Sequence, residues 1–199
     1  MNAALPSTST APVDAHTGPS FSRLNRIMRV LWQLVNLVFF RLSPPPCHAW
    51  RVWLLRLFGA KIGRGAHVYP GAVIWAPWNL EVGEEAGIAN GVIIYCQGRI
   101  TIGRRAVISQ GAHLCAGTHD FEEPGFPLIT KPIVIKDHAW IAAEAFIHPG
   151  VTVPEGCVVG ARSVVTSQLE PWTVCSGFPA KVLRPRHRYL EEQVEKPTA

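Results

Sequence analysis

Residues 135–165 read IKDHAWIAAEAFIHPGVTVPEGCVVGARSVV, and an aliphatic side chain recurs in this stretch at every sixth position. The aliphatic positions are Ile135, Ile141, Ile147, Val153, Val159 and Val165. Small residues follow most of them four positions later, at Ala139, Ala145, Val151, Cys157 and Ser163. Such a period fits neither the roughly 3.6 residues of a helical turn nor the alternation of a simple strand. It does fit a coil in which each hexapeptide supplies one short strand and one corner.

The same period extends toward the N-terminus. Aliphatic residues stand at Ile62, Val68, Ile74, Val82, Ile88, Ile94, Ile102, Ile108 and Leu114. Ile135 and Val153 are eighteen residues apart, whereas Val82 and Ile102 are twenty apart, so one corner of the earlier turns holds two extra residues. Three hexapeptides close one triangular turn, and stacked turns bury a continuous core. The sequence therefore predicts an all-β solenoid, a parallel β-helix, over residues 61–180.

One segment, residues 120–134, breaks this period. It contains Pro124, Gly125, Pro127 and Pro132, and residues of this kind cannot continue the coil. We expect a loop that protrudes from the β-helix and leaves it directly after His119.

Residues 21–60 are predicted to form a helical cap or a membrane-surface segment. Apolar residues recur at intervals of three and four between Ser22 and Leu42, Ser22 can cap the helix, and the prolines that follow stop it. A second helix is expected over residues 49–58. Two tails complete the domain organisation, a disordered one at residues 1–20 without the features of a signal peptide and a basic one at residues 181–199.

The first helix has two possible roles, contact with a membrane surface or packing against the β-helix. Arg29, Gln33, Asn36 and Arg41 interrupt its apolar residues, which argues against a membrane span. Arginines beside large apolar side chains favour a helix that lies on a membrane surface. The alternative is a helix that packs over one end of the β-helix and shields its core.

The amino-acid composition argues against nucleic acid as a partner and indicates the cellular compartment. The net charge of +5 is modest, and no basic run with interleaved aromatic residues suggests nucleic acid. The five cysteines include no C-x-x-C pair, so neither a zinc site nor a redox motif is expected. Free thiols indicate a reducing compartment. We expect a cytoplasmic protein, with a peripheral position at the inner face of the membrane left open by the first helix.

Cys157 and Cys175 are eighteen residues apart, which is one turn of the coil. The spacing predicts that they stack at equivalent corner positions. Stacked side chains point in parallel, and so we expect two buried free thiols and no disulfide.

Several motifs resemble one known family. They are AGTHD at residues 116–120, KPIVI at 131–135, PGVT at 149–152 and GFPAK at 177–181. With the repeats, they resemble the hexapeptide-repeat acetyltransferases, in particular the colanic acid biosynthesis group, which is related to the maltose and galactoside O-acetyltransferases. The resemblance implies a left-handed β-helix, a homotrimer, acetyl-CoA as cosubstrate and a sugar or lipid-linked saccharide as acceptor, in exopolysaccharide biosynthesis.

The resemblance also implies roles for single residues. His119 would be the general base that deprotonates the acceptor hydroxyl, a task suited to imidazole near neutral pH. Asn90 and Asp120 would meet the acceptor. Residues that would bind acetyl-CoA are Ala143, Ala161 and Thr166 along its pantetheine arm, and Lys181 and Arg184 at its phosphates. A backbone amide within residues 140–143 would stabilise the oxyanion.

Two other functions remain as alternatives. One is a non-catalytic β-helix that only scaffolds. The other is a metal enzyme like the γ-class carbonic anhydrases, which the histidines His67, His113, His138 and His148 would have to serve; no metal is expected from the motifs. The identity of the acceptor stays open among a lipid-linked saccharide, a nucleotide sugar and a free sugar.

Overall fold

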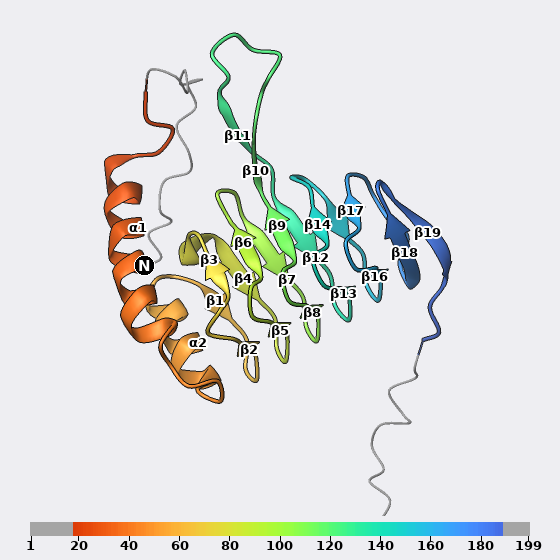
Figure 1. Ribbon diagram of the computed structural model, residues 1–199, viewed down its shortest axis with the longest axis horizontal. Coiled ribbons are helices and arrows are strands. Elements are labelled where there is room, and N and C mark those ends of the chain that lie inside the picture. Colours follow the sequence, from red (N-terminus) through yellow and green to blue (C-terminus); the bar gives the residue numbers. More distant parts are fainter. Residues whose placement is uncertain (1–17, 189–199) are drawn as a thin grey trace, which may run out of the picture.

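The computed structural model describes residues 18–188, which form a three-sided parallel coil with helices over one end (Figure 1). Sheet A contains β1 (Lys61–Ile62), β4 (Leu80–Val82), β7 (Ile100–Ile102), β12 (Ile133–Ile135) and β15 (Thr152–Val153). Sheet B contains β2 (His67–Val68), β5 (Gly87–Ile88), β8 (Val107–Ile108), β13 (Trp140–Ile141), β16 (Val158–Val159), β18 (Thr173–Gly177) and β19 (Ala180–Pro185). Sheet C contains β3 (Val73–Ile74), β6 (Ile93–Tyr95), β9 (His113–Cys115), β14 (Phe146–Ile147) and β17 (Val164–Val165).

The interior of the coil is a column of aliphatic side chains. In sheet A the parallel register stacks Ile62, Val82, Ile102, Ile135 and Val153 on one another. Every aliphatic position that the six-residue period predicted to face inward is buried. The period is confirmed because side chains alternate along each strand and the inward one is aliphatic in every turn.

The corner between sheets A and B brings successive turns into close backbone contact. Gly63, Gly83 and Gly103 occupy this corner in consecutive turns, and a Cβ on any of them would lie 2.5 Å from a backbone nitrogen of the next turn. We call these three residues the glycine column. Asp137 ends the column in the following turn, where its Oδ1 accepts a hydrogen bond from the Arg104 amide at 2.8 Å. Glycine here permits the approach of neighbouring backbones.

Three helical segments cover the first turn: α1 (Arg23–Val35), the π-helix η1 (Asn36–Phe40) and α2 (His48–Leu57). Ser22 caps α1, as predicted, with its hydroxyl accepting from the Asn25 amide at 3.2 Å. Trp32 anchors α1 to the coil, because its side chain is buried and its Nε1 donates to the Ile74 carbonyl at 2.7 Å. The helices therefore close one end of the core.

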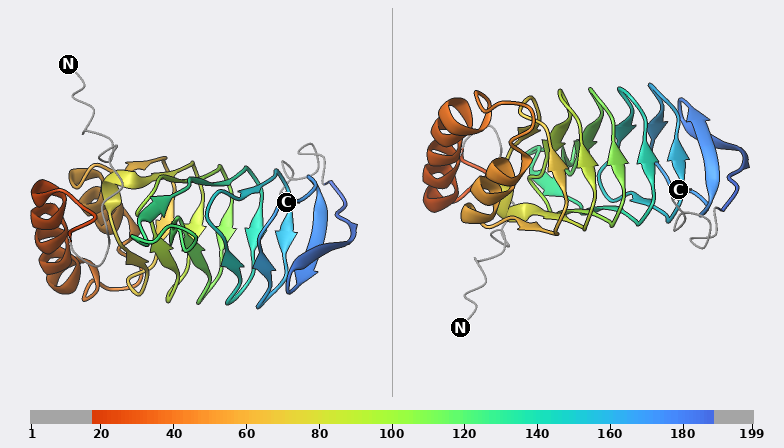
Figure 2. Two further views of the ribbon diagram at one scale, coloured as in Figure 1. Left: turned by 90° about the horizontal axis from the view of Figure 1, so that it is seen from above. Right: turned by 90° about the horizontal axis from the view of Figure 1, so that it is seen from below.

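The outward side of the helical cap is apolar and exposed. In Figures 1 and 2, α1 runs across the end of the coil, with one side turned away from it. The exposed apolar side chains of α1 and η1 are Leu24, Ile27, Val30, Leu31, Leu34, Leu37, Val38 and Phe39. No helix within residues 18–188 has both the length and the apolar character needed to cross a membrane.

Buried Arg51 ties α2 to the coil. Its Nε donates to the Val68 carbonyl at 2.6 Å, and its Nη1 donates to the Ser43 hydroxyl and the Pro44 carbonyl, both at 2.8 Å. The side chain is fully buried, and it is hydrogen-bonded to neutral oxygens and to the His48 ring. A single residue thus joins the loop after η1 to the first turn of sheet B.

The corner between sheets C and A accommodates the extra residues. It holds the short 3-10 helix η2 (Pro77–Asn79) in the first turn and, in the third turn, an antiparallel hairpin of β10 (Gly117–His119) and β11 (Leu128–Thr130). The hairpin extends away from the coil (Figure 1). The expected protruding loop is therefore present, and strand pairing orders its base.

The C-terminal end departs from two predictions. Residues 181–185, predicted to begin a basic tail, belong to β19, which pairs antiparallel with β18. The register also pairs Cys175 with Val159, so that Cys157 and Cys175 do not occupy equivalent positions. The stacking prediction is wrong because the last turn is two residues shorter than eighteen. Both thiols are nevertheless buried and free, with their sulfur atoms 3.9 Å apart.

Candidate active site

His119 is the last residue of β10, at the base of the protruding hairpin. Its ring is half-buried and stacks on the Phe126 ring, with the centroids 4.4 Å apart and the planes at 10°. Its Nδ1 lies 2.8 Å from the Phe126 carbonyl oxygen. Phe126 is held in turn by the loop, since its amide donates to the Glu123 carbonyl at 2.8 Å.

The Phe126 carbonyl determines which nitrogen of His119 carries the proton. A carbonyl oxygen only accepts hydrogen bonds, and therefore Nδ1 must be the donor in this contact. In the neutral ring the other nitrogen, Nε2, is then the proton acceptor. The backbone of the hairpin thus fixes both the orientation and the tautomer of the imidazole.

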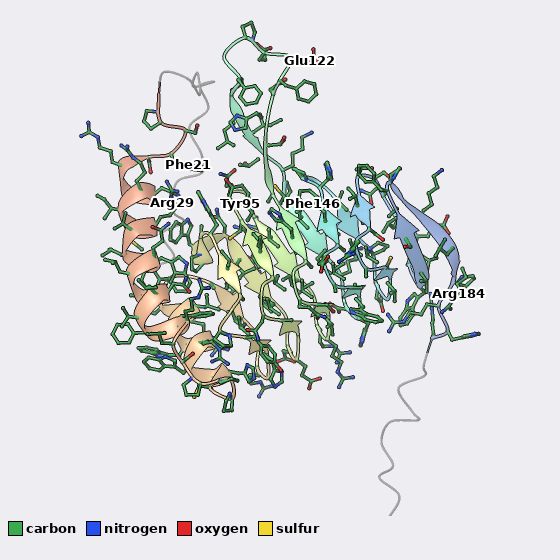
Figure 3. All side chains as sticks on the ribbon, viewed as in Figure 1. Phe21, Arg29, Tyr95, Glu122, Phe146 and Arg184 are labelled. Atoms are coloured by element: carbon green, nitrogen blue, oxygen red, sulfur yellow. The ribbon has the colours of Figure 1, made fainter. Side chains whose placement is uncertain are left out.

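A pocket of about 300 Å³ lies between the hairpin base, sheet C and the N-terminal end of α1. The aromatic side chains Phe21, Trp75 and Tyr95 contribute to its wall, and the ring centroids of Phe21 and Trp75 are 4.9 Å apart. Figure 3 shows Phe21 and Arg29 on the helical side of this region and Tyr95 on the coil. The remaining lining residues are Pro19, Ser20, Arg26, Arg29, Gln97, His119 and Leu128.

Gln97 links the coil to the base of the hairpin. It is buried, and its Nε2 donates to the Tyr95 hydroxyl oxygen at 2.8 Å. Its Oε1 is buried and has no hydrogen-bond partner among the described residues. A Cβ at Gly117, two residues before His119, would lie 1.9 Å from this oxygen, so a larger residue there would require the Gln97 side chain to move.

Asn90 and Asp120 make hydrogen bonds within the chain. The Oδ1 of Asn90 accepts from the Gly71 amide at 2.8 Å, in a corner of the coil. The Oδ1 of Asp120 accepts from the Glu122 amide at 3.2 Å, which caps the turn that follows the catalytic candidate. Neither residue lines the pocket that contains His119. Their contact with an acceptor stays a prediction.

The residues predicted to bind acetyl-CoA follow the coil axis. Ala143 and Ala161 occupy the corner between sheets B and C in adjacent turns, and the Arg162 amide donates to the Ala143 carbonyl at 2.9 Å. Thr166 follows β17, while Lys181 and Arg184 are exposed on β19. Figure 3 shows Arg184 at the far end of the coil from α1. None of these residues lines the pocket that contains His119.

Within residues 18–188, no three side chains of His, Cys, Asp or Glu are grouped so that they could hold a metal ion. His113 lies instead among aromatic rings on the outer face of sheet C, 4.9 Å from the Phe146 centroid. Its Nε2 is buried without a hydrogen-bond partner in the described chain. Burial lowers the pKa of the His113 imidazole.

Comparison with known proteins identifies the family. No family model matches the chain. A putative colanic acid biosynthesis acetyltransferase, WcaF, of Escherichia coli (strain K12) is 44% identical over 162 residues, which cover 81% of this chain and 89% of that protein. The chain belongs to the hexapeptide-repeat acetyltransferases, in the colanic acid biosynthesis group.

Solved structures of hexapeptide-repeat acetyltransferases share the fold. One from Vibrio cholerae O1 biovar eltor, complexed with acetyl coenzyme A, is 25% identical and aligns with 88% of this chain and 96% of its own, with a TM-score of 0.76. A galactoside acetyltransferase in complex with coenzyme A is 24% identical and aligns over 87% and 90% of the two chains, with a TM-score of 0.77. The coil is thus the parallel β-helix of the hexapeptide-repeat acetyltransferases, as the repeats and the resemblance predicted.

The sequence singled out His119 but missed most of the residues that line the pocket around it. Trp75 and Tyr95 directly follow the inward-facing Ile74 and Ile94, and they are twenty residues apart, which is one turn. Alternation therefore places both side chains on the outer side of the coil at sheet C, where their ring centroids lie 6.0 Å apart. This spacing was sufficient to predict that Trp75 and Tyr95 lie side by side. Arg29 could not have been assigned, because nothing in the repeat specifies where α1 packs.

Proposed function

We propose that the chain transfers the acetyl group of acetyl-CoA to a hydroxyl of a saccharide, with His119 as the general base. The contact between His119 Nδ1 and the Phe126 carbonyl carries this proposal, because it leaves Nε2 as the proton acceptor in a pocket of suitable size. Aromatic walls suit the apolar faces of sugar rings, and hydrogen-bonding side chains suit their hydroxyls. The names of the relatives support the same chemistry.

The reaction needs one proton to move twice. Nε2 of His119 takes the proton of the acceptor hydroxyl as its oxygen attacks the thioester carbonyl carbon of acetyl-CoA. The resulting tetrahedral intermediate carries a negative oxygen. When the carbon–sulfur bond breaks, the imidazolium returns the proton to the CoA thiolate, so the products are the acetyl ester and CoA thiol. The other proton stays on Nδ1 throughout, where it is donated to the Phe126 carbonyl oxygen, and this hydrogen bond holds the ring in place.

A backbone amide of the coil is suited to stabilise the oxyanion. The Ala142 amide already donates to the Val159 carbonyl at 2.9 Å. The Ala143 amide has no hydrogen-bond partner among residues 18–188, and it lies in a corner that recurs at Ala161. We assign the oxyanion contact to Ala143 and the path of the pantetheine arm to the corners at Ala143, Ala161 and Thr166.

A homotrimer completes the site in this proposal. His119 and the predicted acetyl-CoA residues do not share a pocket within one chain. Exposed apolar residues on the outer faces of sheets B and C, among them Val73, Val107 and Trp140, offer surfaces for neighbouring copies. The corner of one copy would then face His119 of the next. The molar mass measured by light scattering tests this, and a monomer at working enzyme concentration would refute it.

The acceptor is a component of exopolysaccharide biosynthesis in this proposal, as the name of the Escherichia coli relative suggests. The assay measures release of CoA thiol from acetyl-CoA with three acceptor classes: lipid-linked saccharides, nucleotide sugars and free sugars. We expect His119→Ala to lower turnover by about 10²–10⁴-fold, the usual contribution of a general base. The affinity for acetyl-CoA should change little. A control, His187→Ala, alters an exposed histidine and should leave turnover unchanged. Normal turnover of folded His119→Ala would disprove the role.

The helical cap supports a peripheral membrane position at the inner face of the cytoplasmic membrane. Residues 18–60 contain no Asp or Glu, while Arg23 and Arg41 are exposed beside the apolar outer side of α1 and η1. Basic residues beside an apolar helix face suit the surface of an anionic bilayer. The protein would lie with the coil axis upright on the membrane.

Co-sedimentation with vesicles tests this position. We expect binding to vesicles that contain phosphatidylglycerol, weaker binding to pure phosphatidylcholine, and loss of binding in Ile27→Glu with Leu34→Glu. Leu183→Glu is the matched control, because Leu183 is equally exposed but lies on β19 at the opposite end. Equal binding of both variants would contradict the assignment.

A further inference from the structure

The pocket that contains His119 has one cationic wall. Arg26 and Arg29, one turn apart on α1, line it on the side that faces the coil, and no Asp or Glu is among its lining residues. Neither arginine forms an ion pair with any described residue. A neutral sugar acceptor would leave these two charges without a partner.

Arg29 in particular is held in place but left uncompensated. Its guanidinium carbon lies 4.5 Å from the Trp75 ring centroid and 5.3 Å from that of Phe21, and its Nε donates to the Asn25 side-chain oxygen at 3.2 Å. Burial lowers its pKa, which means that the cation is partly desolvated. A desolvated cation is stabilised by an anionic partner, and the planar guanidinium suits a carboxylate or a phosphate.

Tyr95 supplies a donor on the opposite side of the same pocket. Because Gln97 Nε2 donates to the Tyr95 hydroxyl oxygen, the proton of that hydroxyl is free to reach a ligand oxygen. The pocket therefore combines two cations, a hydroxyl donor and aromatic faces next to the base. This set suits an acidic sugar better than a neutral one.

We propose that the acceptor saccharide is anionic and that Arg29, assisted by Arg26, binds its carboxylate or phosphate while His119 accepts the proton of a nearby hydroxyl. The inference rests on the proposed function. To that function it adds the negative charge of the acceptor and Arg29 as the residue that selects an anionic acceptor.

Equilibrium binding to the full chain at constant ionic strength tests the proposal, with three probes of matched ring structure. They are methyl β-D-glucuronide as the carboxylate, D-glucose 1-phosphate as the phosphate, and neutral methyl β-D-glucoside. We expect at least one anionic probe to bind roughly tenfold or more tightly than the neutral one, since hydrogen bonds to charged groups are the stronger ones. The better of the two anions identifies the group that is recognised.

Variants assign the effect to the pocket. Arg29→Gln should remove the preference for the anion, whereas Arg29→Lys should keep most of it because the charge remains. Arg64→Gln is the control, since Arg64 is exposed in a corner of the coil and does not line the pocket. Circular dichroism of the Gln and Lys variants checks that both are folded.

Three results would overturn the inference: equal binding of neutral and anionic probes, no binding of either anion, or an unchanged preference in folded Arg29→Gln. A raised KM for acetyl-CoA in Arg29→Gln would also overturn it, because it would assign the cations to the CoA phosphates. The proposed function fails separately. If the protein transferred acetyl to a neutral saccharide and Arg29→Gln did not affect this transfer, the proposed function would stand and only the inference of an anionic acceptor would be rejected.

Discussion

Two histidines of this chain, His119 and His113, lie in different surroundings. His119 keeps a defined proton on Nδ1 through the Phe126 carbonyl and offers Nε2 to a pocket. His113 has an Nε2 that is buried without a partner, between the rings of Tyr95 and Phe146. The first arrangement favours proton transfer. The second disfavours the protonated ring and connects folding to pH.

His113 should make the protein less stable at acidic pH. Its folded-state pKa is lowered from 6.5 by burial. Above pH 6.5 the ring is mostly neutral in both the folded and the unfolded chain. Below it, the unfolded chain binds a proton more readily than the folded chain, so the free energy of unfolding decreases as the pH is lowered. We expect His113→Phe, which suits the aromatic neighbours, to show a shallower loss of stability between neutral and mildly acidic pH. Urea denaturation across that range measures it, and the exposed His187→Phe is the control.

The cysteines should react in two classes. Burial raises the pKa of Cys96 to about 12, and burial with the neighbouring Cys175 raises that of Cys157 to about 12. Disulfide reagents attack the thiolate and must reach it, so at pH near 8 we expect only the half-buried Cys47 and Cys115 to react in the native protein. Cys115 should react more slowly than Cys47, because burial raises its pKa as well. All five should react in denaturant without reductant. Three thiols would mean that Cys157 and Cys175 are bridged.

At the scale of elements, the corners of the coil constrain the sequence more tightly than its strands. A Cβ at Gly83 would lie 2.5 Å from the Arg104 amide nitrogen, whereas a Cβ at Gly87 would meet nothing within 4 Å. We expect Gly83→Ala to lower the free energy of unfolding by about 2–3 kcal/mol, since the backbone must shift. Gly87→Ala should change it by less than about 0.5 kcal/mol. Thermal or urea denaturation compares the pair, and equal losses would contradict the role of the glycine column.

The final strand, β19, is expected to bind the phosphates of acetyl-CoA. Lys181 and Arg184 are exposed on it and pair with no carboxylate among the described residues. We expect Lys181→Ala with Arg184→Ala to raise the KM for acetyl-CoA several-fold and to affect acetyl-pantetheine far less, because only CoA carries the adenosine phosphates. Steady-state kinetics with both donors decides. Equal losses would show that the two residues act structurally.

The sequence predicted the interior of these elements well and their exterior poorly. Ile88 and Ile94 had to face inward because strand alternation and the closure of the triangle leave no other arrangement. Tyr95 and Arg29 meet across the pocket only because α1 packs at one particular angle, which no repeat specifies. Cys175 was misplaced because the last turn loses two residues as it passes into the β18–β19 hairpin. Local periodicity carries no information about such endings.

At the scale of the whole molecule, a coil of parallel strands has two open ends with unpaired edges, which invite association with other chains. The helices cover the first turn, and β19 turns back antiparallel over the last one (Figures 1 and 2). The two ends also differ in composition, with apolar residues and arginines on the outer face of α1 and exposed Lys181 and Arg184 at the other. The two ends therefore prevent further strands from adding to the coil, and their different compositions make the two ends of the molecule chemically distinct.

Every turn lengthens the coil by one strand spacing, about 4.8 Å, so the number of turns between two residues sets their separation along the coil axis. In the proposed trimer, the turns between the β10–β11 hairpin and β19 set how far along the coil axis His119 of one copy lies from Lys181 and Arg184 of the next, and so the length of the donor that can span them. Removing residues 139–156, one turn of eighteen, should leave a folded coil in which Ala161 takes the place of Ala143. We expect that shortened protein to lose its use of acetyl-CoA while it still accepts acetyl-pantetheine, which needs no distant anchor. Equal activity with both donors in the shortened coil would show that the number of turns does not select the donor.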